Sequence, residues 1–109
     1  MALAPKQLAQ AAITDVNVTI YTVPAATVTV VQTIDICNTT AASKLVYVHL
    51  VPSGGAAGTG NALLYMMTVA AYSTCTWQGP QTLDTVGDFI SVKADAVGLT
   101  VTISGLELT

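Results

Sequence analysis

Alternation of apolar and polar residues is the feature that most limits how this chain can fold. Residues 99–104 read LTVTIS, and residues 16–22 and 27–36 follow the same two-residue period. Successive side chains of a β-strand point to opposite faces, so this period is typical of half-buried strands. The β-branched residues that favour strands fill 37 of the 109 positions (14 Val, 6 Ile and 17 Thr). The pattern predicts an all-β chain.

The alternating segments are short, and turn residues separate them at intervals of roughly 8–12 residues. The strongest turn signals are Pro24, the glycine-rich residues 53–61, Gly79-Pro80, Gly87 and Gly98. This spacing predicts a single antiparallel β-sandwich, jelly-roll-like, of seven or eight short strands.

The segment at residues 27–36 interrupts its own alternation. Its apolar positions are expected on one face, namely Val28, Val30, Ile34 and Ile36. Gln32 then falls on the apolar face and Val31 on the polar face, so we expect a β-bulge near these two residues. Gly105 predicts another bulge in the last strand.

Residues 2–13 lack the alternation that marks the rest of the chain. Residues 7–12 contain only Gln, Leu and Ala, which favour a short helix. So short a helix is marginal in water on its own. We therefore expect an N-terminal arm at residues 1–15, ordered by lying on a neighbouring chain, and a β-sandwich domain at residues 16–109.

Charged residues make up only 8% of the chain, with three Lys, no Arg and a net charge of −3. An ordinary domain has about 25%. Three scattered lysines form no basic patch, which argues against nucleic-acid binding. The longest apolar stretch, residues 62–71, is half the roughly 20 residues of a spanning helix, so we expect no membrane segment. The low charge favours a chain that hides its surface against other chains; a threonine-rich, solvated sheet is the alternative.

No residue pattern indicates an enzyme, a metal site or a cofactor site. His49 is the only histidine and does not combine with Cys37 and Cys75 at a metal-ligand spacing. Cys75, His49 and Asp84 could be written as a catalytic triad, but no sharp turn presents the cysteine. The glycines of residues 54–60 lack the lysine of a phosphate-binding loop, so we expect a mobile connection there.

The remaining candidates are cysteines and aromatic residues. The N-terminus shows no apolar segment of a secretory signal, so we expect synthesis in a reducing compartment and two buried thiols, Cys37 and Cys75. Four aromatic residues are candidates for stacking on a sugar ring: Tyr21, Tyr65, Tyr72 and Trp77. Trp77 alternates with Cys75, which favours a core position instead.

Six short motifs stand in a fixed order along the chain: IYTVPA (20–25), CNTT (37–40), VPSGG (51–55), GNAL (60–63), VGDFI (86–90) and LTVTISGLE (99–107). In this order they resemble small virion structural proteins of tailed double-stranded DNA bacteriophages. The resemblance spans about residues 5–109. Ala26 departs from it, because a glycine often follows the VPA motif in that group, and Gly79-Pro80 is not part of the pattern.

The resemblance implies a non-enzymatic β-sandwich built into a virion that is assembled in the host cytoplasm. The leading hypothesis is a capsid decoration, or cement, protein that binds and stabilises the major capsid shell. Its expected partners are the major capsid protein and copies of itself in a homotrimer. A neck, tail or fibre component is the first alternative, and a carbohydrate-binding surface module is the second.

We expect the contacts with other chains to come from the arm and from the strand at residues 45–51, which is apolar on both faces. The candidate interface residues are Leu3, Pro5, Leu8, Ile13, Leu45, Tyr47, His49 and Val51.

Overall fold

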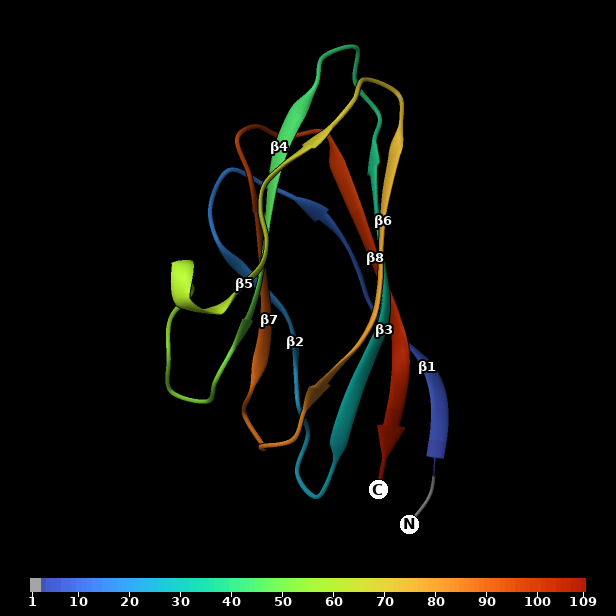
Figure 1. Ribbon diagram of the computed structural model, residues 1–109, viewed down its shortest axis with the longest axis vertical. Coiled ribbons are helices and arrows are strands. Elements are labelled where there is room, and N and C mark those ends of the chain that lie inside the picture. Colours follow the sequence, from blue (N-terminus) through green and yellow to red (C-terminus); the bar gives the residue numbers. More distant parts are fainter. Residues whose placement is uncertain (1–2) are drawn as a thin grey trace.

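Eight antiparallel strands form two facing sheets in the computed structural model, which describes residues 3–109 (Figure 1). The strands are β1 (Leu3–Ile13), β2 (Val18–Thr22), β3 (Val28–Asn38), β4 (Lys44–Val51), β5 (Ala62–Val69), β6 (Thr74–Leu83), β7 (Phe89–Ala94) and β8 (Leu99–Leu108). A 3-10 turn, η1 (Thr59–Asn61), precedes β5. None of the described residues forms a helix long and apolar enough to cross a membrane.

The first sheet has the strand order β1-β8-β3-β6, and the second has the order β2-β7-β4-β5. Eight strands in two sheets of this order form a jelly roll. The all-β, antiparallel sandwich predicted from the two-residue period is therefore confirmed.

The N-terminal segment is a strand of the first sheet, and the helix expected at residues 7–12 is wrong. β1 pairs with β8 from Leu3, opposite Leu108, to Ile13, opposite Leu99. Pairing with β8 satisfies backbone groups that a lone short helix would leave exposed, so tertiary contact overrides local propensity. β1 thus lies on its own chain, and residues 14–17 form the connection to β2 at the boundary expected for the arm. The start of β1 and the end of β8 lie side by side (Figure 1).

The core fills the space between the sheets with β-branched side chains. Ile34 and Ile36 from β3 and Ile103 from β8 are fully buried on the inner face of the first sheet. Val46, Val48, Ile90 and Val92 line the facing side of the second sheet. The core-facing residues named for each sheet lie two positions apart along their strands, which is why the alternation in the sequence was informative.

The bulge expected near Gln32 occurs in β3, but the bulge expected in the last strand is wrong, because β8 has no extra residue at Gly105. Gln32 is an extra residue in β3, because Val31 pairs with Gly105 and Thr33 with Ser104 of β8. The bulge switches the faces of β3, so Val31 is buried and Gln32 is exposed. A side chain at Gly105 would overlap the carbonyl oxygen of Val30, which explains the glycine.

Because of this bulge, the faces expected for the residues at the start of β3 are wrong. Thr29 and Val31 are fully buried there, whereas Val28 and Val30 are only half-buried. The sequence placed Val28 and Val30 in the core because it extended the register of Ile34 backwards through the bulge.

Leu8 is an extra residue in β1 at the same level, because Gln7 pairs with Ser104 and Ala9 with Ile103. In β6, Gly79 and Pro80 both stand opposite Gln32. Irregular pairing therefore occurs in all three strand pairs of the first sheet near Ser104.

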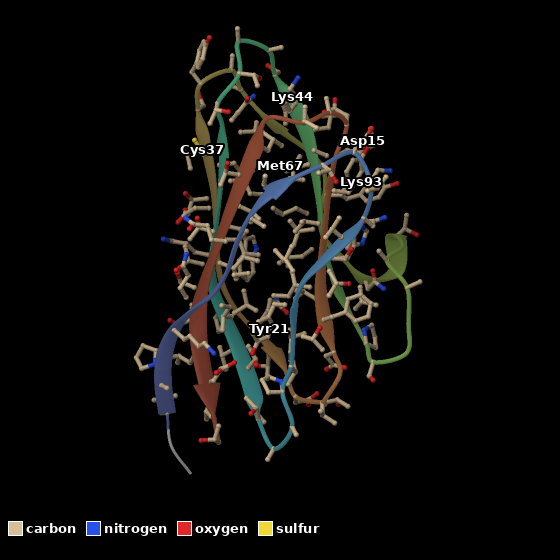
Figure 2. All side chains as sticks on the ribbon, turned by 180° about the vertical axis from the view of Figure 1, so that it is seen from behind. Asp15, Tyr21, Cys37, Lys44, Met67 and Lys93 are labelled. Carbon is tan, nitrogen blue, oxygen red and sulfur yellow. The ribbon has the colours of Figure 1, made fainter. Side chains whose placement is uncertain are left out.

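A polar cluster joins the two sheets inside the sandwich. The Tyr21 hydroxyl on β2 lies 2.7 Å from the Thr29 hydroxyl on β3 and donates to Glu107 on β8. Glu107 also pairs with Lys6 of β1, with Nζ 3.1 Å from Oε1. Figure 2 shows Tyr21 in the space between the sheets. This cluster ties together four strands of both sheets.

Candidate functional site

The residues named as a possible catalytic triad do not form one. His49 lies on β4 of the second sheet, whereas Cys75 lies on β6 of the first and Asp84 directly follows β6. Burial raises the pKa of the Cys75 thiol, which disfavours the reactive thiolate. Within residues 3–109, no three His, Cys, Asp or Glu side chains are grouped closely enough to hold a metal ion.

The two cysteines are free thiols with different surroundings. Cys75 is half-buried, because it pairs with Ile36 of β3, and paired residues of neighbouring strands lie on the same, here inward, face of the sheet. Cys37 follows Ile36 in β3 and is exposed, so the expectation of two buried thiols is wrong for Cys37. Figure 2 shows Cys37 on the opposite side of the molecule from Lys93.

A pocket of about 230 Å³ lies on the outer face of the second sheet. Its wall combines three strands with the connection before β2 and the loop that carries η1. The lining residues are Asn17, Tyr47, His49, Ala57, Gly58, Thr59, Tyr65 and Lys93. We call this the outer-face pocket.

The loop between β4 and β5 fixes His49 at the base of the pocket. His49 Nδ1 lies 3.0 Å from the Gly58 carbonyl oxygen and 3.1 Å from Asn61 Oδ1. A carbonyl oxygen only accepts, so Nδ1 donates, and Nε2 of the neutral imidazole is left as an acceptor. The Asn61 amide also binds Gly58 N–H and the Ala56 carbonyl. The glycine-rich segment is therefore a hydrogen-bonded cover over β4.

Two tyrosines and a lysine form the open side of the pocket. Tyr47 on β4 and Tyr65 on β5 meet edge to face, with ring centroids 5.2 Å apart and planes at 80°. Lys93 pairs with Tyr47 across the sheet, and its Nζ lies 5.4 Å from the Tyr47 ring centroid. Among residues 3–109 the one ion pair is Lys6–Glu107, so Lys93 has no carboxylate partner there. The site therefore presents the ammonium group of Lys93 over the aromatic ring of Tyr47.

The structure divides the candidate interface residues into two sets. Four are buried within the chain itself: Leu8, Ile13, His49 and Val51. Four reach the surface: Leu3, Pro5, Leu45 and Tyr47. β4 lies between β5 and β7, and the β4–β5 loop covers its outer face near Val51. The two-sided apolar pattern of β4 thus has an explanation within one chain, and contact of the exposed set with other chains stays a prediction.

The apolar edge formed by β5 was not predicted from the sequence. Tyr65, Met66 and Met67 are three consecutive exposed residues, with 53%, 53% and 41% of their surfaces accessible. Met66 has a φ of 52°. This left-handed conformation accompanies a bulge, because Val46 pairs with Met67 and Val48 with Leu64. The continuous apolar run of β5 was visible in the sequence, but its position at a sheet edge was not.

The aromatic residues considered for sugar stacking are dispersed. Tyr21 is buried between the sheets, and Trp77 is half-buried against the core, with Gly79 beneath its ring. Tyr72 lies on the exposed turn between β5 and β6. Only Tyr65 lies in the outer-face pocket, where its neighbour is Tyr47.

No protein-family model matches the chain, and no curated protein matches it by sequence. Solved structures do match. A chain of the Bacillus endospore appendages, described as a family of disulfide-linked pili, has a TM-score of 0.59 at 15% identity. The match covers 98% of this chain and 88% of that one.

Two viral chains are also similar. One, from infectious bursal disease virus strain Gx, has a TM-score of 0.53 at 11% identity. The other, from the T13 particle of the same virus, has a TM-score of 0.53 at 8% identity. Each match covers 97% of this chain but only 31% and 30% of the viral chains, respectively. These similarities show a shared fold.

Proposed function

We propose that this chain is a non-enzymatic structural subunit that works by packing against other protein chains in a particle. The observation that carries the proposal is the exposed apolar edge of β5. Residues 62–69 contain no charged residue and no proline, although lysine and proline are the usual protection of a free sheet edge. At the edge of the first sheet, by contrast, β1 carries Pro5 and Lys6.

The backbone of Met66 supports this role for β5. A left-handed conformation costs a residue with a side chain roughly 1–2 kcal/mol, and strained residues concentrate where they serve a function. Here the strain accompanies the exposure of three apolar side chains. Contact of a second chain with Met66 and Met67 would bury these two side chains and offset the cost.

Within this role, the place in a particle that we propose first is decoration of a capsid. The chain would bind and stabilise the major capsid shell as a homotrimer in the virion, which is assembled in the host cytoplasm. The resemblance of the ordered motifs to those of tailed-phage virion proteins supports this proposal, and jelly rolls are common in viral capsids. The alternative is a position in the neck, tail or fibre, which would differ from capsid decoration in having few copies of the chain per particle.

A filament subunit is the second candidate. The similarity to the endospore appendage chain extends over 98% of this chain and 88% of the other, so a single jelly roll accounts for nearly the whole of both. Fold alone does not determine function, and the two candidates make different predictions about assembly.

A charge on the edge of β5 tests the structural role itself. Met67→Lys places an ammonium where an added chain would pack, so it should abolish assembly or binding to particles while the monomer stays folded. The matched control is Val97→Lys, at an exposed residue in the β7–β8 turn. The proposal is wrong if Met67→Lys assembles like the unmodified protein.

Two measurements separate the candidates. Quantitative mass spectrometry of purified virions should find a copy number comparable with that of the major shell protein for decoration, and far fewer copies for a neck or tail part. Electron microscopy of the purified chain alone should show filaments only if it is a filament subunit.

A further inference from the structure

We propose that the outer-face pocket binds an acidic monosaccharide unit, that is, a sugar ring carrying a carboxylate. This would give the particle surface a ligand-binding function beyond its structural role. The pocket, at about 230 Å³, is smaller than the roughly 300–1,000 Å³ of sites for drug-sized molecules, which suits one sugar ring.

The single cation of the pocket selects the charge of the ligand. Lys93 lies over the Tyr47 ring and has no carboxylate within 4.0 Å among residues 3–109. Tyr47 holds the ammonium group in place without neutralising its charge. One lysine matches the single charge of a carboxylate, whereas a doubly charged phosphate is typically held by several donors and cations.

The polar lining matches the hydroxyl groups of a sugar. His49 is 4% exposed, and its Nε2 is an acceptor for which no partner lies among the described residues. Asn17 Oδ1 receives the Ser91 hydroxyl at 3.4 Å, which leaves the Asn17 amide nitrogen as a donor. Thr59 adds a hydroxyl that can donate and accept. Donors and acceptors from three segments of the chain suit a ligand that carries both.

Tyr65 supplies the apolar surface that a sugar ring requires. Its ring is edge-on to Tyr47 and about half exposed. The C–H groups on one face of a sugar can pack on this ring while the hydroxyls at its rim reach the polar lining. The tyrosine pair is pre-organised by β4 and β5, so little side-chain freedom remains to be lost on binding.

The test is a titration of the full chain, followed by amide NMR shifts, with three probes: methyl β-D-glucuronide, methyl β-D-glucoside and sodium acetate. We expect the glucuronide to shift Gly58, Tyr65 and Lys93 and to bind roughly tenfold more tightly than the neutral glucoside. Lys93→Met should remove this preference, and Tyr65→Ala should weaken both sugars. The control is Lys44→Met, which removes the same charge outside the pocket.

Three outcomes would overturn the proposal. The first is the absence of shifts at the pocket with either sugar. The second is acetate binding as tightly as the glucuronide, which would mean that the pocket takes a carboxylate of a protein partner instead. The third is an unchanged preference in folded Lys93→Met.

Discussion

The Tyr21 phenol donates a 2.5 Å hydrogen bond to the Glu107 carboxylate across the space between the two sheets. The same hydroxyl lies beside Thr29, and Glu107 also accepts from Lys6. A sandwich of apolar strands gains directional contacts between its layers from such a cluster.

Removal of the Tyr21 hydroxyl should destabilise the fold. In Tyr21→Phe, Thr29 and Glu107 each lose a partner in a poorly hydrated position, at a cost of about 1–3 kcal/mol. Urea unfolding would measure the loss. A matched control is Tyr72→Phe, because Tyr72 is the most exposed tyrosine, and this change should have almost no effect. Equal stability of the two variants would contradict the structural role of the cluster.

Glu107 should make stability depend on acid pH. The hydrogen bond from Tyr21 lowers the pKa of Glu107 below 4.5, with a smaller contribution from Lys6. The folded state therefore favours the carboxylate, so its contribution is complete above pH 4.5 and is lost as the pH falls through the lowered pKa. Unfolding midpoints measured against pH should show this loss, and Glu107→Gln should lack it. Asp84→Asn, which changes an exposed acid, is the control.

Tyr21 should make stability depend on alkaline pH in the opposite direction. Burial, together with the hydrogen bond to Glu107, raises the pKa of Tyr21 from 10.0 to about 12. The folded state favours the protonated phenol, so its contribution is complete below pH 10.0 and is lost as the pH rises towards about 12. Ultraviolet titration of tyrosinate in the unmodified protein and in Tyr21→Phe gives the value by difference. A difference curve centred on pH 10.0 would contradict the prediction.

Ile13 tests whether β1 is part of the sandwich. Its side chain is 1% exposed, so Ile13→Ala should cost about 2–5 kcal/mol of unfolding free energy. Leu3→Ala, at the exposed start of the same strand, should change stability by less than about 0.5 kcal/mol. If both changes are harmless to the isolated chain, residues 3–13 are an arm after all.

Gly105→Ala should destabilise the first sheet. The added methyl group would overlap the Val30 carbonyl oxygen and crowd Leu8, and such overpacking typically costs about 1–3 kcal/mol. Gly60→Ala is a fair comparison, because no atom lies within 4 Å of the added carbon. Thermal unfolding of the two variants would distinguish a required glycine from a tolerated one.

The sequence predicts the sandwich well because period-two alternation records directly which residues face the core. Gln32 even revealed its bulge, since a polar residue interrupted an apolar series. β1 was not predictable in this way. Its Ala and Gln residues carry no alternation, and the strand forms because β8 offers a partner along its whole length.

The outer-face pocket was predictable only in part. Tyr47 and His49 stand in one strand and were recognised as surface candidates. Asn17, Tyr65 and Lys93 come from three other segments, and the strand order β2-β7-β4-β5 is what brings them together. Tyr65 was already a candidate for sugar stacking, but a single sequence carries no record of strand order, so its grouping with Asn17 and Lys93 could be found only in the folded chain.

The irregular pairing that crosses the first sheet couples the lengths of its strands. A deletion of Gln32 alone would keep Val31 opposite Gly105 and Thr33 opposite Ser104 of β8, but it would leave two residues of β6, Gly79 and Pro80, with no residue of β3 opposite them. A deletion of a paired residue in β3 would instead shift the register, so that every residue beyond it exchanged its inner and outer faces. Insertions and deletions in β1, β3 and β6 should therefore be tolerated only in matched combinations. Exposed positions of the same strands, by contrast, should accept point substitutions freely.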